Sequence, residues 1–390
     1  MEDRYGRVER HRWRVEELAE VDGNGRDDKR RVVRGASSKG GVILNSGEMD
    51  SILSRGASAA VDLGLGEFDD LAAIESNGVL ESEERSVGDR ARKRGTKSLG
   101  TLGSGNHFLE LQVVDRIVDE QAASAFGLRE GLVTAMIHTG SRGLGHQVCS
   151  EHVANIESRY KQDGELWHSS EWGITLPDRQ LAAAPIHSRE GASYLDAMSA
   201  AGNFAFANRS TLTQKLRDVM RGRFGRDGDL DVVYDVSHNI AKIEDHVVHG
   251  KSCKCCVHRK GATRALGGDH AELAARFSGV GQPVLVPGDM GTASWVLAGP
   301  KKGVNAAFSS SCHGAGRKMS RTAARNSIDS GQLLRRLEES GVHVRAKTPN
   351  VLSEEAPEAY KDVDDVIELT SKAELARPVA RLRPFAVIKG

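Results

Sequence analysis

Short apolar runs that stop at histidine- and glycine-containing turns are the feature that most restricts the fold of this chain. Three of them are GLVTAMIHTGSRGLGH, LDVVYDVSHN and, less regularly, TLGSGNHFLELQVV. Runs of this length, rich in β-branched residues, are typical of strands bounded by loops. The sequence therefore predicts that His138, His238 and His107 lie at strand ends or edges, where a rigid scaffold commonly holds functional groups.

Other segments predict the remaining elements. PVLVPGDMGTASWVLAG indicates a strand, a glycine loop and a second apolar segment, and the terminal RPFAVIKG indicates a short strand. Apolar residues return every three to four positions over 46–65, which predicts a helix with Ser46 as its N-cap, and a second helix is expected over 84–94. The mixture predicts one large α+β catalytic domain with mixed β-sheets.

Size and charge restrict the function less tightly. At 390 residues and 39% hydrophobic content, the chain can form one large domain or two ordinary ones. Its 54 basic and 54 acidic residues cancel, so any contact with RNA requires a local basic patch. No apolar run approaches the roughly 18–20 residues that span a bilayer, and the N-terminus is charged, which predicts a cytoplasmic protein. Residues 1–36 show little apolar periodicity and are expected to be a poorly ordered segment before a domain spanning 37–390.

The cysteines are odd in number and clustered, which argues against a secreted disulfide framework and favours a reducing compartment. They are Cys149, Cys253, Cys255, Cys256 and Cys312. KSCKCCVH resembles part of a zinc site, but it lacks a second Cys or His pair at the usual spacing. Reduced thiols in or near a strand are the expectation.

The three turn histidines are candidate metal ligands. One histidine beside an apolar strand is more often a structural residue, but three in similar turns can converge on one ion, because neutral imidazole binds divalent transition metals. Side-chain chemistry alone leaves zinc and manganese open, and the scarcity of carboxylates near these histidines leans towards zinc.

CHGAGRKMSR predicts a phosphate-binding turn around His313. Gly314 and Gly316 permit close backbone approach, and their N–H groups together with the start of a following helix would bind an anion. A histidine in such a turn can act as a nucleophile on phosphorus. Three arginines follow at four-residue spacing, so on a helix they would share one face: Arg317, Arg321 and Arg325. A solvated basic face is the alternative, and the adjacent glycines favour phosphate binding.

Seven segments in order resemble the signature segments of the RtcB family of RNA ligases. They are LGTLGSGNHFLELQ, MIHTGSRGLGHQV, YDVSHNIAKIEDH, HRKGATRA, VPGDMGTASWVLAG, SSCHGAGRKMSR and the terminal VIKG. The similarity covers about residues 37–390. It implies the family's own single-domain α+β fold and a GTP- and manganese-dependent activity. RtcB ligases join RNA ends carrying a 2′,3′-cyclic phosphate or 3′-phosphate to RNA with a 5′-hydroxyl.

The resemblance also implies roles for individual residues. The histidine that GTP guanylates matches His313. The metal-binding histidines match His107, His138 and His238, with Asn106 and Asn239 beside them. Guanine recognition is implied for Glu110 and Lys389, and stacking for Phe108 and Tyr360. The rest of the nucleotide pocket matches Pro287, Gly288, Asp289, Met290, Ser294, Gly314, Ala315 and Gly316. Candidate contacts to RNA or nucleotide phosphates are Arg142, Lys260 and Arg321.

The sequence departs from the family at its N-terminus. The family carries an earlier motif, D-x-G-C-G-M, whose aspartate and cysteine bind metal, and no cysteine precedes Cys149 here. A truncated, misassigned or frameshifted start is therefore expected, with a weak or absent second manganese site. The alternatives are an inactive or regulatory RNA-end-binding homologue and, more remotely, a metallophosphatase. The family relation implies RNA as partner, as tRNA halves or broken ends, and an archease-like activator.

Overall fold

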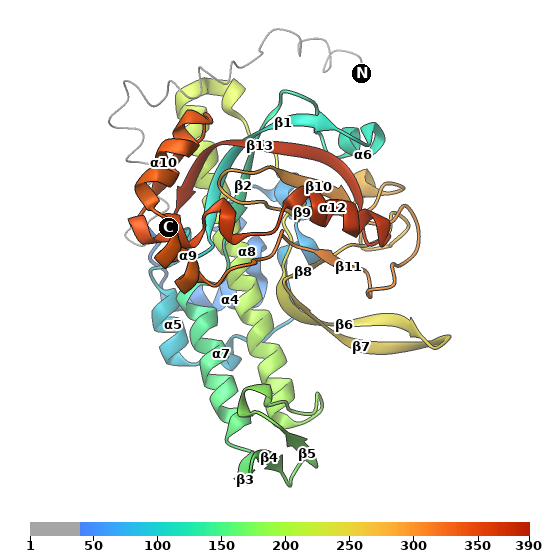
Figure 1. The fold of residues 1–390 in the computed structure, drawn as a ribbon. Helices are drawn as coiled ribbons and strands as arrows, with labels where there is room; N and C mark the ends of the chain where they lie inside the picture. Colours follow the sequence, from blue (N-terminus) through green and yellow to red (C-terminus); the bar gives the residue numbers. More distant parts are fainter. Residues whose placement is uncertain (1–39) are drawn as a thin grey trace. The chain divides into compact units, whose positions relative to one another are not determined.

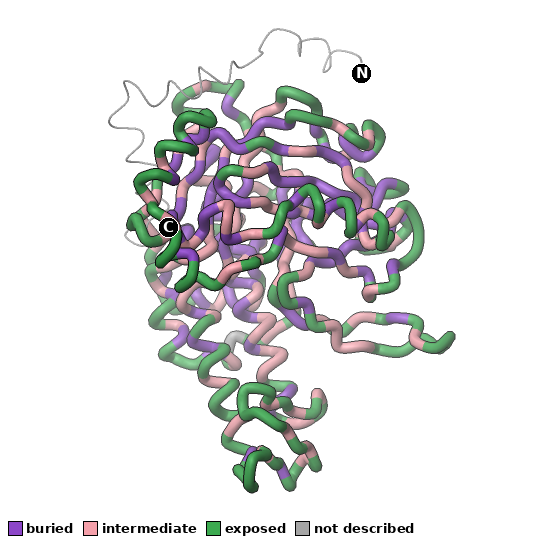
Figure 2. Tube along the Cα trace, viewed as in Figure 1, coloured by how far each residue is buried: buried purple, intermediate pink, exposed green. Residues whose placement is uncertain are grey.

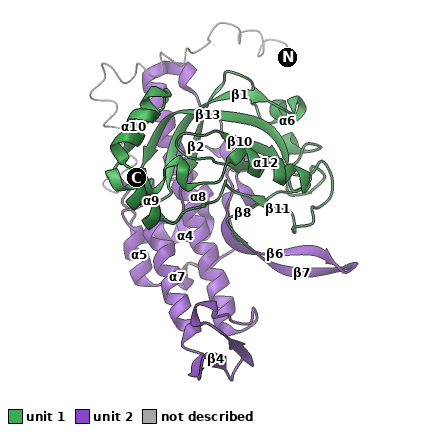
Figure 3. Cartoon of the chain, viewed as in Figure 1, with its two compact units in different colours: residues 1–34, 102–138, 259–390 green, residues 35–101, 139–258 purple. Residues whose placement is uncertain are grey.

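The computed structural model describes residues 40–390, so the expected N-terminal segment 1–36 lies outside the described residues. The described chain forms two compact units, each assembled from separate stretches of sequence (Figure 3). Unit 1 contains residues 102–138 and 259–390, and unit 2 contains residues 40–101 and 139–258. Helices and antiparallel strands occur together, which confirms the predicted α+β class.

Unit 1 is built on a six-stranded sheet whose central strand is the last in the chain (Figure 1). Its order is β2–β1–β13–β10–β9, and β12 pairs in parallel with β13. These strands are β1 Phe108–Ile117, β2 Val133–His138, β9 Pro283–Val286, β10 Ser294–Ala298, β12 His343–Ala346 and β13 Arg377–Lys389. The C-terminal strand is thus 13 residues long, much longer than the RPFAVIKG segment predicted.

Helices and short elements complete unit 1. They are α6 Glu120–Ala125, β8 Ala262–Arg264, β11 Ser310–Cys312, α9 Arg321–Ser327, α10 Ser330–Glu339, α11 Pro349–Glu354 and α12 Val363–Lys372, with 3-10 turns at Ala275–Phe277 and Pro357–Ala359. One apolar cluster packs Val284, Val286 and Leu297 of the sheet against Ile367 of α12. A second packs α10 against β12 and β13. Burial is accordingly concentrated on this sheet (Figure 2).

Unit 2 is mainly helical. Its helices are α4 Ser46–Asp62, α5 Asp89–Gly95, α7 Arg142–Glu157 and α8 Arg189–Phe224, with 3-10 turns at Phe68–Ala73, Glu75–Gly78, Glu84–Ser86, Arg179–Leu181 and Gly225–Gly228. Its strands are β3 Lys161–Asp163, β4 Leu166–Ser169 and β5 Ile174–Leu176, and the hairpin β6 Asn239–Val248 with β7 Lys251–Lys260, whose last two residues belong to unit 1. Ile52, Leu144 and Phe204 meet in its core. Among the helices of the described chain, none, including α8, is apolar enough to cross a bilayer.

Two predicted helices exist, with different starts. The N-cap of α4 is Asn45 and not Ser46, because Asn45 and Glu48 form a reciprocal capping box. The helix kinks at Gly56, where φ is +53° and a Cβ would lie 2.2 Å from the Gly78 carbonyl oxygen. The region predicted as a helix over 84–94 contains a 3-10 turn followed by α5.

The strand predicted to end at His238 does not form. Asp235, within the stretch LDVVYDV, forms an isolated bridge with Ile74 beside a 3-10 turn. Regular strand structure begins at Asn239. His238 therefore precedes a strand, as His107 does, whereas His138 ends β2 as predicted.

A buried ion pair ties α8 to the first 3-10 turn of unit 2. The Arg217 side chain is 1% exposed, and its two terminal nitrogens donate to the two Asp70 oxygens at 2.6 Å each. Its Nε donates to the Leu230 carbonyl oxygen at 2.7 Å, and Glu67 lies 3.9 Å away. The guanidinium is thus satisfied mainly by one buried carboxylate.

Asp70→Ala should lower the free energy of unfolding of unit 2 by roughly 3–5 kcal/mol, because it leaves a buried guanidinium without its principal counter-charge. Urea unfolding followed by circular dichroism measures the loss. Asp69→Ala, at the exposed neighbouring position, is the matched control and should change stability little. Equal stability of the two variants would show that Asp70 does not stabilise Arg217.

Candidate functional site

Three of the predicted site residues form a row across neighbouring strands of unit 1. Phe108 lies opposite Lys389 of β13 and opposite His138 of β2. Directly opposed residues in a sheet project from the same face, and the side chains do meet. The Phe108 and His138 rings lie 5.3 Å apart, and the Lys389 ammonium lies 5.0 Å from the Phe108 ring centre. The β2–β1–β13 pairing therefore places a ring between a histidine and a cation.

Three predicted histidines of unit 1 lie near one another. The His107 and His138 rings are 5.9 Å apart, and the His138 and His313 rings are 6.3 Å apart. They come from the residue before β1, the end of β2 and the residue after β11. Chain segments far apart in sequence thus bring the candidate nucleophile beside two candidate metal ligands.

The spacing of His107 and His138 suits a shared ion. Two imidazoles on one metal, with metal–nitrogen distances near 2.0–2.1 Å, have ring centres roughly 5–6 Å apart. The third predicted ligand, His238, belongs to unit 2. Within residues 40–390, no group of three or more His, Cys, Asp or Glu side chains is arranged to hold a metal. The three-histidine metal site therefore stays a prediction.

Glu110 is held by a buried polar network. The Gln112 amide donates to Glu110 Oε2 at 2.7 Å and to Ser294 Oγ at 2.9 Å, and Ser294 Oγ accepts from the Gly288 N–H at 3.2 Å. Burial raises the pKa of Glu110 to about 7, although Lys389 and the Gln112 hydrogen bond act in the opposite direction. Gln112 was not predicted from the sequence, yet it joins two residues that were.

The Pro287–Met290 loop is shaped by local sequence. A Cβ at Gly288 would lie 2.1 Å from the Ala293 carbonyl oxygen, so only glycine fits. Asp289 accepts from the N–H groups of Gly291 and Thr292 at 2.9 and 3.1 Å, closing a tight turn. Burial raises its pKa. The loop lies beside the His313 turn, because a Cβ at Gly314 would lie 3.5 Å from the Pro287 carbonyl oxygen.

Lys389 and Tyr360 meet at an acid that sequence analysis missed. Glu355, 1% exposed, accepts a hydrogen bond from the Tyr360 hydroxyl and lies 4.0 Å from Lys389 Nζ. Burial lowers the pKa of Lys389, and the nearby Glu355, Glu110 and Asp289 carboxylates oppose that shift. Burial and Glu355 raise the pKa of Tyr360 above its ordinary value. Glu355 lacks a glycine- or histidine-rich context, so no sequence signal identified it.

The arginine prediction needs correction. α9 begins at Arg321, so Arg317 lies outside the helix and the three arginines do not share one helical face. Arg317 is instead folded into the protein, donating from Nε to the Met319 carbonyl oxygen at 3.0 Å and from Nη2 to the Glu354 carbonyl oxygen at 2.7 Å. The glycine turn also does not lead directly into a helix, because four residues separate Gly316 from α9.

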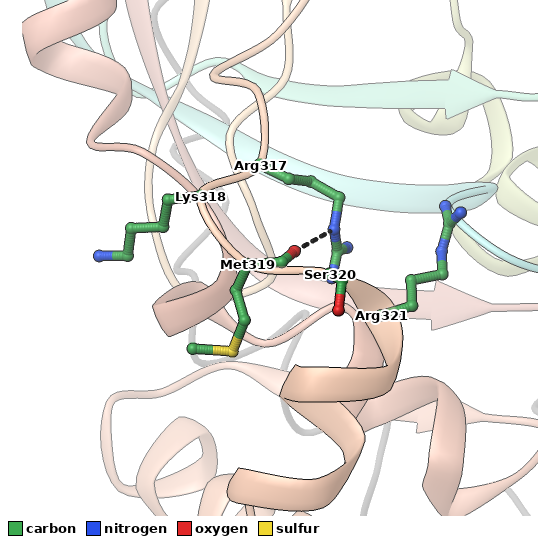
Figure 4. Close-up of a pocket in the computed structure, with 5 residues that line it drawn as sticks. All are labelled: Arg317, Lys318, Met319, Ser320 and Arg321. Atoms are coloured by element: carbon green, nitrogen blue, oxygen red, sulfur yellow. Dashed lines mark hydrogen bonds between the residues drawn. The ribbon is translucent and has the colours of Figure 1, made fainter.

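A cavity of about 540 Å³ adjoins this segment and is lined by Arg317, Lys318, Met319, Ser320 and Arg321 (Figure 4). In the close-up, the Lys318 and Met319 side chains point away from the Arg317 guanidinium. Arg321 is half exposed and pairs with Glu355 at 3.2 Å. Of the two arginines that line the cavity, Arg321 is the more exposed and retains surface available to a phosphate.

Unit 2 carries the remaining candidates. Arg142 begins α7 with φ of +55°, its Nε lies 3.4 Å from Thr101 Oγ1, and burial lowers its pKa. The turn before His238 is held by the buried Glu75, which accepts from the Ser237 N–H at 2.8 Å and from Lys242 at 2.7 Å. Asn239, the first residue of β6, is exposed.

Cys253, Cys255 and Cys256 lie on β7 of the β6–β7 hairpin, where the sequence predicted thiols in or near a strand. The Cys253 and Cys255 sulfurs are 3.8 Å apart, and Cys256 Sγ lies 3.4 Å from His258 Nε2. All five cysteines fall within residues 40–390 and none forms a disulfide there. Most of the hairpin is exposed or half-buried (Figure 2).

Comparison of the sequence with known proteins matches the chain to one family. The profile of the family described as "tRNA-splicing ligase RtcB" matches residues 11–390. A protein of that name from Archaeoglobus fulgidus is 47% identical over 363 residues, covering 92% of this chain and 73% of the relative. Its namesake from Thermococcus kodakarensis is 46% identical, covering 93% of this chain and 74% of the relative. The chain belongs to the RtcB family.

The RtcB match begins earlier than the signature segments indicated. It starts at residue 11 and so reaches into the segment that the motifs had left outside the resemblance. A namesake from Methanococcus maripaludis, 44% identical over 365 residues, likewise covers 93% of this chain. The expectation of missing N-terminal metal ligands concerns residues before 40, which lie outside the described part of the chain.

His313 of this RtcB-family chain is set up as a neutral imidazole. Burial, aided by the Lys260 charge, lowers the pKa of His313 from its usual value near 6.5 to about 4. Gly261, with φ of +69°, brings the backbone close, since a Cβ there would lie 3.7 Å from His313 Nε2. A neutral ring keeps a lone pair, which a nucleophile requires.

In metal-free protein, the His313 imidazole should titrate near pH 4, because burial and Lys260 both disfavour its protonated form. Nitrogen-15 NMR of labelled histidine, assigned with His313→Gln, measures the midpoint. Lys260→Met removes one of the two causes and should raise the pKa part of the way towards 6.5. A midpoint near 6.5 in the unaltered chain would contradict the described environment.

Proposed function

We propose that this chain is a GTP-dependent RNA ligase that joins a 3′-phosphate or 2′,3′-cyclic phosphate end to a 5′-hydroxyl end. Its substrates would be tRNA halves or broken RNA, as the shared name of its relatives suggests. One observation supports the proposal: His313, whose pKa is lowered, lies beside His138 and Lys260 in the same unit as the buried Glu110 and Lys389. That unit would therefore supply both the nucleophile and the polar groups that bind the nucleotide.

The chemistry would proceed by covalent transfer. A His313 nitrogen attacks the α-phosphorus of GTP, forming a P–N bond as the bond to pyrophosphate breaks. The RNA 3′-phosphate then attacks that phosphorus and leaves His313 free, giving an anhydride between the RNA end and GMP. The 5′-hydroxyl attacks the RNA phosphorus, loses its proton and expels GMP. Activation is needed because an unmodified 3′-phosphate would have to expel oxide or hydroxide.

The basic residues, the histidines and the glycine turn would each have a separate role in this reaction. The basic Lys260 and Arg321, with Arg142 from unit 2, would bind RNA or nucleotide phosphates. His107 and His138, with His238 and with Asn106 and Asn239 beside them, would hold manganese, which when bound neutralises phosphate charge. The Gly314–Gly316 backbone would approach the phosphates closely, with Gly316 at φ of +75°.

Guanine selection would follow from the buried acid and base. Guanine offers N–H donors on its Watson–Crick edge and an acceptor at O6. Glu110 would accept from the donors and Lys389 would donate to the acceptor, while Phe108 and Tyr360 stack on the base. Ser294, Ala315 and the Pro287–Met290 loop would close the pocket. Adenine would leave Glu110 without its N1–H partner.

His313→Ala should abolish transfer of labelled guanylate from GTP to the protein, because it removes the attacking nitrogen. Acid-labile label on purified chain is the measurement, and His270→Ala, outside the described cluster, is the control. Label retained in His313→Ala would reassign the nucleophile.

Joining of 3′-phosphate to 5′-hydroxyl RNA and bound manganese per chain are measured alongside, with and without an archease-like activator. Guanylation without joining would favour the alternative of an inactive or regulatory RNA-end-binding homologue.

Glu110→Ala should weaken GTP binding by about 1–3 kcal/mol, since buried guanine N–H groups lose their acceptor. In the unaltered chain GTP affinity should fall as pH drops below about 7, because Glu110 is ionised above its raised pKa and protonated below it. Calorimetric titration over pH 6–8 tests both points, and Glu110→Ala controls for titration of the nucleotide itself. Equal binding of ATP and GTP by the unaltered chain would refute this account of selectivity.

A further inference from the structure

Glu355 occupies the end of α11 with its two carboxylate oxygens facing different groups. Oε1 lies 3.4 Å from Arg317 Nη1 and 3.2 Å from Arg321 Nε. Oε2 accepts from the Tyr360 hydroxyl and lies 4.0 Å from Lys389 Nζ. One buried carboxylate is thus shared between the segment that follows the His313 turn and the two residues expected to contact guanine.

Two neighbours of Glu355, Arg317 and Tyr360, are each fixed by more than one contact. Arg317 Nη1 also donates to the Tyr360 hydroxyl oxygen at 3.0 Å, and the Arg317 guanidinium lies 4.9 Å from the Tyr360 ring centre. Arg317 and Tyr360 are joined further by an isolated backbone bridge. The orientation of the Tyr360 ring therefore depends on hydroxyl contacts with Glu355 and Arg317 and on a ring contact with Arg317.

Charge balance points the same way. Lys389 is buried, and the charged groups facing it are Glu355, Glu110, Asp289 and Arg317. All three acids are buried, and Glu355 lies 4.0 Å from Lys389 Nζ. Because Glu355 is also held by two guanidiniums and a hydroxyl, its carboxylate is fixed in place beside the Lys389 ammonium.

We propose that Glu355 is a positioning residue for the nucleotide: it holds Tyr360 and Lys389 in the arrangement that binds guanine. It also ties both to Arg317, four residues after His313. This inference rests on the proposed GTP-dependent function. Because Glu355 would act through Tyr360 and Lys389, its loss should change nucleotide affinity and base selection rather than the covalent step.

The matched pair Glu355→Gln and Glu354→Gln tests this role. Glu355→Gln keeps side-chain shape but removes the charge, and should weaken GTP binding about tenfold or more, the loss expected when a buried charged hydrogen-bond partner disappears. Guanylation of His313 at saturating GTP should change less than about threefold, while the preference for GTP over ATP shrinks. Glu354, whose side chain pairs instead with Arg325 at 3.3 Å, should bind GTP normally when changed to Gln.

A second variant covers the case in which Glu355→Gln does not fold. Tyr360→Phe keeps the stacking ring and removes only the hydroxyl that donates to Glu355, so it should weaken GTP binding several-fold. Binding is measured by fluorescence titration of the full chain with a methylanthraniloyl derivative of GTP, and folding by thermal unfolding. If folded Glu355→Gln, or Tyr360→Phe, binds GTP as tightly as the unaltered chain, the positioning role of Glu355 is overturned. The proposed function is then unaffected. Failure of the unaltered chain to bind GTP would overturn the proposed function and this role with it.

Discussion

The candidate site depends first on the pairing of β1 with β13. That ladder joins residues near position 110 to the last residues of the chain, and it is continued by β2 on one side and β10 on the other. Because opposed residues share a sheet face, the register itself places Lys389, Phe108 and His138 next to one another. A slip of one residue would send Lys389 to the opposite face and separate it from the Phe108 ring.

Burial then gives the site its chemistry. The same desolvation that raises the pKa of Glu110 lowers the pKa of Lys389 and that of His313. Of these groups, the neutral His313 imidazole keeps the lone pair that a nucleophile requires. These pKa shifts arise from burial of the side chains on the sheet, so the reactivity of the residues depends directly on the packing of the fold.

Local sequence pattern predicted some of the elements around the candidate site and not others. His138 at the end of β2 and the strand–loop–strand around Pro287–Met290 followed from local pattern. The segment before His238 is not a regular strand although its residues favour β structure, and the arginines share no helical face because Arg317 precedes α9 and donates to Glu354 and Glu355. Glu355 and Gln112 could not be found, since their importance comes from long-range contacts that no spacing records.

Two buried carboxylates with arginine partners, Asp70 and Glu355, show how similar interactions can have different consequences. Asp70 is engaged chiefly by the parallel nitrogens of one guanidinium, and the pair is complete in itself. Glu355 is shared among two guanidiniums, a hydroxyl and an ammonium, and its arginine contacts, at 3.2–3.4 Å, are longer than those of Asp70. A carboxylate shared in this way cannot give its best geometry to every partner, so a shift of one donor changes what it offers the others. The shared Glu355 carboxylate therefore couples the positions of its partners more than it stabilises the fold. It connects the Arg317 segment after His313 to the residues expected to hold guanine.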